Sequence, residues 1–230
     1  MRYNEYELNT LPYKEALISD KRTYLQFYFS LLKTKHLFIF SFFPSNDYNL
    51  RIIKIYLFFF SFTIYYTVNA LFFSDATIHK IYEDGGSFNF IYQIPQIIYS
   101  SLISSVLNSL LKSLSLSDKN IIQIKQEINI QKIEEKAKEV FKCLYYKFIS
   151  FFIISLIFLL FFWYYVACFC AVYKNTQLHL LKDSIISFLL SLLYPVGLFL
   201  IPGIFRIPAL RANKKDKETM YKFSKFIQLI

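Results

Sequence analysis

The chain has 230 residues, of which 55% are hydrophobic and 18% are charged, and its formal net charge is +10. A soluble domain needs a charged surface, and its charged fraction is usually about a quarter, so this composition excludes a single soluble domain. The positive charge would also fit a nucleic-acid-binding protein. No basic recognition motif accompanies it, however, and we expect no nucleic-acid partner.

Residues 1–54 combine a polar opening segment with an apolar stretch. Residues 1–22 are polar and charged and lack the apolar region of a cleavable signal peptide. The apolar stretch 23–43 is interrupted by two lysines and a histidine, which would be costly inside a membrane span. We therefore expect an amphipathic helix at the membrane interface, whose lysines reach the lipid headgroups. A fifth span over 23–43 is the alternative.

Four later stretches contain no Asp, Glu, Lys, Arg or His. Each is close to the length of about 20 helical residues that crosses a hydrocarbon core. We therefore predict four transmembrane helices, at residues 55–73, 90–111, 148–172 and 184–205.

The segment 112–147 lies between the second and third predicted spans. Its apolar residues recur at helical spacing, and oppositely charged residues can pair on the other face. We predict a cytosolic amphipathic helix here. The predicted fold is an all-α, polytopic membrane protein with three parts: a cytosolic lead with an interfacial helix at 1–54, a four-helix transmembrane region at 55–205, and a basic cytosolic tail at 206–230.

The basic residues fall almost entirely in alternate segments. Of the 26 lysines and arginines, all but three lie before residue 55, within 112–147, or after residue 205. Basic segments stay on the cytoplasmic side during membrane insertion. We therefore predict a multi-pass integral membrane protein with both termini and the central segment in the cytosol.

The second predicted span carries the main polar stripe of the transmembrane region. Small and polar residues at helical spacing let helices approach closely and bond to one another, so we predict a packing face. A water-lined path is the alternative. The residues of this candidate face, with a partner in the first span, are Asn69, Gln93, Gln96, Ser101, Ser105 and Asn108.

The basic tail is a candidate surface for anionic lipids of the inner leaflet. The residues predicted to bind them are Arg206, Arg211, Lys214, Lys215 and Lys217. Cys143 lies at the predicted cytosolic boundary of the third span, which makes it a candidate for palmitoylation. No catalytic motif occurs and no acid or base lies within a predicted span, so we expect no enzyme activity, no cofactor and no metal site.

Several ordered strings have a family resemblance. They are IHKIYEDGGSFNFIYQIPQIIYSSLIS, SLSLSDKNI, FFWYYVACFCAVYKNTQ and LLYPVGLFLIPGIFRIPALR. Together with the lead, they resemble the membrane-spanning region of uncharacterised multi-pass transmembrane proteins of protists, ciliates in particular. The resemblance implies a membrane protein but no biochemical activity.

The sequence therefore favours a structural or interaction membrane module. Such a module would hold a protein partner, a cytosolic assembly or a second copy of itself through the segment 112–147 and the basic tail. A channel or transporter subunit is the alternative. It is favoured by the polar second span and by Pro195, Gly197 and Pro202, which would kink the fourth span.

Overall fold

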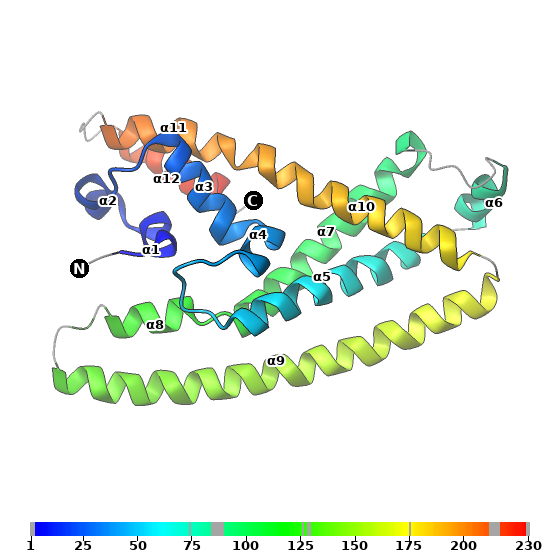
Figure 1. Cartoon of the computed structure of the whole chain (residues 1–230), viewed down its shortest axis with the longest axis horizontal. Coiled ribbons are helices and arrows are strands. Elements are labelled where there is room, and N and C mark those ends of the chain that lie inside the picture. The colour runs from blue at the N-terminus through cyan, green and yellow to red at the C-terminus, as the bar shows by residue number, and fades with distance from the viewer. Residues whose placement is uncertain are drawn as a thin grey trace. The chain divides into compact units, whose positions relative to one another are not determined.

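The computed structural model describes residues 3–73, 75–83, 90–125, 127, 130–174, 176–211 and 217–228. Within these ranges every regular element is an α-helix, numbered α1 to α12 (Figure 1). Four of the described helices are long and apolar enough to cross a membrane. The prediction of an all-α protein with four membrane-length helices is therefore confirmed.

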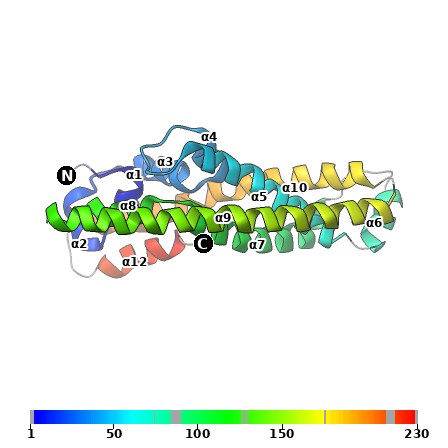
Figure 2. The ribbon, with the colours of Figure 1, turned by 90° about the horizontal axis from the view of Figure 1, so that it is seen from below.

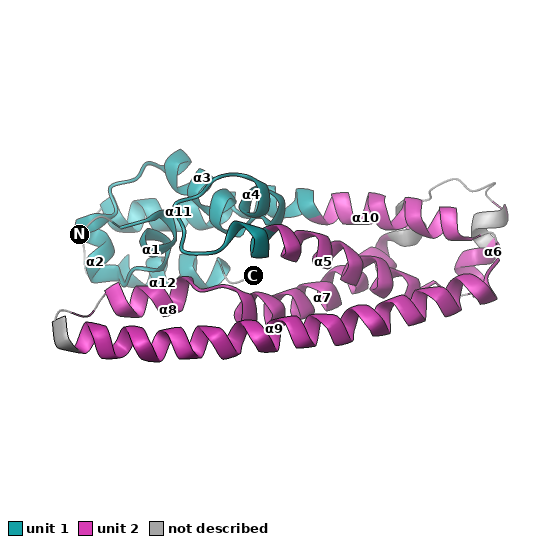
Figure 3. Ribbon diagram, turned by 60° about the horizontal axis from the view of Figure 1, so that its bottom comes forward, with its two compact units in different colours: residues 1–54, 192–230 teal, residues 55–191 magenta. Residues whose placement is uncertain are grey.

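The helices form two compact units, coloured separately in Figure 3. Unit 1 comprises residues 1–54 and 192–230, and unit 2 comprises residues 55–191. We predicted the lead and the tail as separate segments, whereas the structure places them in one unit, together with the end of the fourth apolar stretch. The two units share α5 and α10, because each of these helices begins in one unit and ends in the other.

Unit 2 holds most of the apolar helices. Its elements are α5 (Arg51–Leu71, from residue 55), α6 (Asp75–Glu83), α7 (Phe90–Ser115), α8 (Asp118–Lys125), α9 (Ile130–Val172) and α10 (Gln177–Leu198, up to residue 191). The first three predicted spans coincide with α5, α7 and the second half of α9. α9 exposes large apolar residues such as Ile153, Leu160 and Trp163, as expected of a helix that faces lipid.

The predicted helix over 112–147 is wrong in its boundaries. The second span continues to Ser115, α8 follows as a short separate helix, and α9 then runs without a break into the third span (Figure 2). No glycine or proline lies between Ile130 and Val172, so nothing ends the helix at the predicted start of the third span. Lys147 of α9 fixes the preceding turn, because its Nζ donates to the carbonyl of Leu116 (2.6 Å) and to Oδ1 of Asn120 (3.2 Å).

Aromatic rings join α5 to α10 inside unit 2. The ring of Phe188 lies 5.8 Å from that of Phe58, 5.3 Å from that of Phe62 and 5.8 Å from that of Tyr65, all in edge-to-face geometry. Such ring pairs contribute roughly 0.5–1.5 kcal/mol beyond the area they bury. They therefore hold the first and fourth apolar helices together.

Unit 1 is built from short helices around the end of the fourth apolar stretch. Its elements are α1 (Glu5–Thr10), α2 (Tyr13–Ser19), α3 (Tyr24–Lys35), α4 (Leu37–Phe42), α11 (Leu200–Arg211) and α12 (Glu218–Ile227), with the start of α5 and the end of α10. The expected interfacial helix over 23–43 is two helices, because His36 ends α3 and its Nδ1 accepts the backbone N–H of Ile39 to cap α4. The buried face of α3, Phe27 and Leu31, packs on Ile207 of α11.

Side chains of α3 and its cap also bond to backbone carbonyls of α10 and α11. Pro195 lies inside α10, and the helix is interrupted at Phe199 between α10 and α11. Such breaks leave backbone carbonyls without their helical partners, and neighbouring side chains can donate hydrogen bonds to them. Three such contacts occur: Tyr24 Oη to Leu200 O (2.8 Å), Tyr28 Oη to Val196 O (3.1 Å) and His36 Nε2 to Leu192 O (2.7 Å). The residue numbers rise along α3 and fall along α10–α11, so the two elements are antiparallel. These contacts fix the antiparallel register of the two elements.

Candidate functional site

The centre of the polar cluster in unit 2 is Asn69 of α5, whose side chain is fully buried. Its Nδ2 donates to Oγ of Ser184 on α10 (3.1 Å). Its Oδ1 accepts from Nε2 of Gln96 (2.9 Å) and from Oγ of Ser100 (3.2 Å), both on α7. One asparagine therefore ties three helices together, and Asn69 and Gln96, which we predicted to share a face, are in contact.

A second polar contact lies further along α7, where Oγ of Ser61 donates to Oδ1 of Asn108 (2.6 Å). The face of α7 that meets α5 thus follows every fourth residue: Gln96, Ser100, Ser104 and Asn108. Two members of the predicted stripe, Ser101 and Ser105, lie one position away from this face: Ser101 is half-buried and Ser105 is exposed. The side chain of Gln93 lies outside the described residues.

The chemistry of this cluster is that of neutral donors and acceptors. Hydrogen bonds between transmembrane helices are worth about 1 kcal/mol each, so the cluster can position helices. It contains no side chain that could act as an acid or base. Within the part of the chain that the structure describes, no group of three His, Cys, Asp or Glu residues could hold a metal ion.

Unit 1 contains a buried ionic cluster that we did not predict from the sequence. We predicted that Arg206 binds lipid headgroups, but the structure corrects this, because its side chain is completely buried. Its Nε and Nη2 donate to Oδ2 of Asp20 (3.1 and 2.8 Å), and Nη2 also donates to the carbonyl of Leu8 (2.7 Å). The guanidinium lies against the rings of Phe27 and Tyr221, with its carbon 4.9 and 4.6 Å from the ring centres.

Asp20 also binds a second arginine, Arg22. Nε of Arg22 donates to Oδ1 of Asp20 (2.7 Å) and Nη2 to Oδ2 (2.8 Å), while Nη1 donates to Oδ1 of Asn9 and to Oγ of Ser30 (both 2.9 Å). Burial alone would raise the pKa of Asp20, but the hydrogen bonds and charges of Arg22 and Arg206 outweigh it and lower that pKa below its ordinary value. The carboxylate is therefore ionised at neutral pH and binds α2 to α11.

Within the described residues, the predicted basic tail comprises the end of α11 and the helix α12. Oη of Tyr221 donates to the carbonyl of Leu11 (2.8 Å), and Nζ of Lys225 donates to the carbonyl of Thr10 (2.7 Å), so α12 packs on the start of the chain. Of the other residues predicted to bind lipid, Arg211 is exposed and Lys217 is half-buried. Lys214 and Lys215 lie outside the described residues.

Cys143 lies on α9 and is exposed, with Sγ 3.8 Å from Nδ2 of Asn120. Its palmitoylation stays a prediction.

No protein-family model matches the chain, and neither a curated protein nor a solved structure shows significant similarity to it. The resemblance to protist transmembrane proteins therefore stays a prediction.

Proposed function

We propose that this protein is a multi-pass membrane protein that acts as a structural or interaction module, holding a protein partner or a second copy of itself at the membrane. The main support for this proposal is that polar side chains within the apolar helices form hydrogen bonds between helices. Asn69 bonds to Gln96, Ser100 and Ser184 across three helices, so these groups are engaged in packing. Packing of this kind supports a stable scaffold.

The proposed topology has four spans and both termini in the cytosol. The distribution of basic residues supports the cytosolic side. Unit 1 supports the even number of spans, because it contains both the start of α5 and the end of α10, and because α12 packs on the chain start. A fifth span over 23–43 would put the termini on opposite sides. The 12 residues of α3 and 6 of α4 are also short of the roughly 20 that a span needs.

The proposed lipid partners are anionic lipids of the inner leaflet. Among the described residues, Arg211 is the exposed member of the predicted basic set. Basic residues near an anionic surface contribute about 1 kcal/mol each, and salt weakens this attraction. Arg206 takes no part in it, because its guanidinium is bound to Asp20.

A channel or transporter subunit is the second candidate. Two observations favour it. The helix break at Phe199 resembles the discontinuous helices of transporters. In addition, Oγ of Ser104 and Oγ of Ser155 are buried without a hydrogen-bond partner among the described residues, which would suit a water molecule or a passing solute.

Substitution of neighbouring serines of α7 distinguishes the two functions. Ser100 is fully buried and bonded to Asn69, whereas Ser105 is exposed, so Ser100→Leu and Ser105→Leu make the same chemical change on opposite faces. For a packing face, Ser100→Leu should lower stability by about 1–3 kcal/mol through overpacking. Ser105→Leu should leave stability unchanged, and the wild type should show no flux.

The measurements are thermal unfolding of the purified protein and solute flux into liposomes. A water-lined path predicts the opposite pattern. In that case Ser100→Leu would leave stability nearly intact and abolish a flux present in the wild type, because an apolar constriction dewets. That pair of results would contradict the scaffold function and support the channel function.

A further inference from the structure

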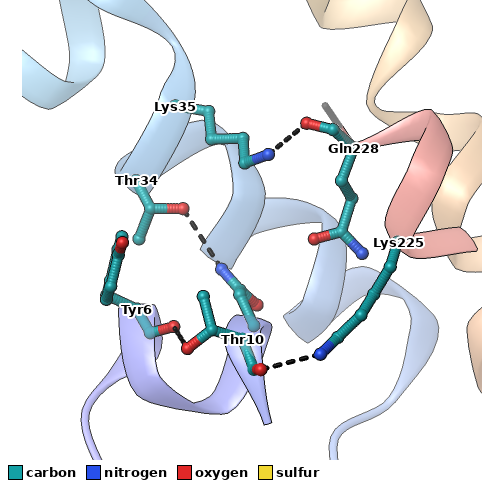
Figure 4. A pocket seen from close by; sticks show the side chains of 7 residues that line it. Tyr6, Thr10, Thr34, Lys35, Lys225 and Gln228 are labelled. Atoms are coloured by element: carbon teal, nitrogen blue, oxygen red, sulfur yellow. Dashed lines mark hydrogen bonds between the residues drawn. The ribbon is translucent and has the colours of Figure 1, made fainter. Parts of the chain in front are cut away.

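Unit 1 contains a pocket of about 260 Å³ between α1, the end of α3 and α12 (Figure 4). It is smaller than the roughly 300–1,000 Å³ of typical sites for drug-sized ligands. Among the described residues, the side chains that line it carry two ammonium groups, those of Lys35 and Lys225, and no carboxylate. Its size and charge suit a small anionic group.

Both ammonium groups are held in place by the fold. Nζ of Lys225 donates to the carbonyl of Thr10 (2.7 Å), and Nζ of Lys35 donates to the carbonyl of Gln228. An ammonium has three N–H donors, so each lysine can also donate to a ligand. Burial lowers the pKa of Lys225, the charge of Arg206 lowers it further, and only Glu15 acts in the opposite direction. A bound anion would stabilise the charged form of Lys225.

Gln228 provides an independent sign of a missing partner. Its side chain lines the pocket, the residue is 7% exposed, and its Nε2 has no hydrogen-bond partner among the described residues. In Figure 4 the amide end of Gln228 points back toward the middle of the group of lining side chains. A buried donor left without an acceptor is destabilising, and a ligand oxygen would accept its hydrogen bond.

We propose that this pocket binds a phosphate group, with Lys35, Lys225 and Gln228 as its donors. This site goes beyond the proposed function, in which anionic lipids are attracted only diffusely to exposed basic residues. Phosphate oxygens accept several charge-assisted hydrogen bonds at once, which matches two ammonium groups and an amide. The phosphate can come from a lipid that carries a terminal phosphate monoester or from free phosphate.

The test uses the full-length protein in lipid nanodiscs. Calorimetric titration with inorganic phosphate should give saturable binding to the wild type in nanodiscs of neutral phosphatidylcholine. Lys225→Met should lower the affinity roughly tenfold or more, the effect of losing one charge-assisted hydrogen bond. Lys222→Met is the matched control, because Lys222 lies on the same helix, is exposed and pairs with Glu218 outside the pocket. Its affinity should stay within about twofold of the wild type, since exposed ion pairs contribute little.

A second arm identifies the source of the phosphate. Nanodiscs with phosphatidic acid should raise the thermal stability of the wild type and weaken its phosphate titration if the ligand is a lipid headgroup. Phosphatidylserine, which lacks a terminal phosphate, should do neither. Phosphate binding unaffected by phosphatidic acid would assign a soluble ligand.

Absence of saturable binding to both probes would overturn the proposal, as would an equal loss in Lys225→Met and Lys222→Met. If Lys225→Met lowers the melting temperature without ligand, Gln228→Leu replaces it. This variant removes a donor without changing charge, and it should still weaken phosphate binding several-fold. Wild-type affinity in Gln228→Leu would then count against the site.

Discussion

Removing the carboxylate of Asp20 should open the packing of the N-terminal helices. Asp20→Asn keeps the shape of the side chain but removes the charge that two arginines share. The pair with Arg206 is fully buried, with side-chain exposures of 0% and 1%, so the change leaves a buried guanidinium without its counter-charge. Breaking a buried pair from one side costs about 3–5 kcal/mol. Amide hydrogen exchange of α1–α3, followed by mass spectrometry on the purified protein, measures this cost locally.

The expected change is large enough to separate from background. Since about 1.4 kcal/mol is a factor of ten, exchange in α1–α3 should accelerate roughly a hundredfold to several thousandfold. Glu218→Gln makes the same carboxyl-to-amide change in an exposed pair, with side chains 72% and 46% exposed, and should cost at most about 1 kcal/mol. If Asp20→Asn accelerates exchange no more than Glu218→Gln, the ionic cluster does not stabilise unit 1 as we argue.

Three further predictions follow from described contacts. The folded-state pKa of Asp20 is lowered, so its contribution to the stability of unit 1 should be complete above the unfolded pKa of about 3.9 and should be lost as the pH falls through the folded pKa. The amide exchange rates of the wild type and of Asp20→Asn should therefore converge only in that acidic range. A Cβ on Gly203 would lie 2.7 Å from Cε2 of Tyr24, whereas one on Gly197 would meet nothing within 4 Å. Thermal unfolding should therefore show Gly203→Ala destabilised by about 1–3 kcal/mol and Gly197→Ala unchanged or stabilised, and equal effects would contradict the packing. With the other cysteines replaced by serine, exposed Cys143 should react with an impermeant maleimide only from the cytosolic side, and labelling from outside would refute the topology.

Hydropathy alone located the long helices because an uncharged run of sufficient length has few alternatives to a membrane span. It did not locate their ends. The third span has no glycine or proline at the boundary, so α9 extends back to Ile130. The fourth predicted span, 184–205, contains the break at Phe199, since its prolines and glycines mark irregular backbone but not which residue interrupts the helix.

The candidate sites show the same limit at the level of single side chains. Serines occupy both 100–101 and 104–105, so periodicity could not decide which member of each pair faces inward; the contact of Ser100 with Asn69 decides it. Arg206 looked like one more basic residue of a cytosolic tail, because its partner Asp20 lies 186 residues earlier. A charged residue between apolar residues of a helix was a signal that such a partner exists.

The joining of the two ends of the chain in unit 1 has a consequence for biosynthesis. Asp20 emerges from the ribosome 186 residues before Arg206, which at roughly 5–20 residues per second is a delay of about 10–40 s. During that time α1–α3 lack α11 and α12, and Phe27 and Leu31 have no Ile207 to pack against. The N-terminal helices therefore complete their packing only after the fourth apolar helix has been made, so unit 1 can assemble only once all four apolar helices have been synthesised.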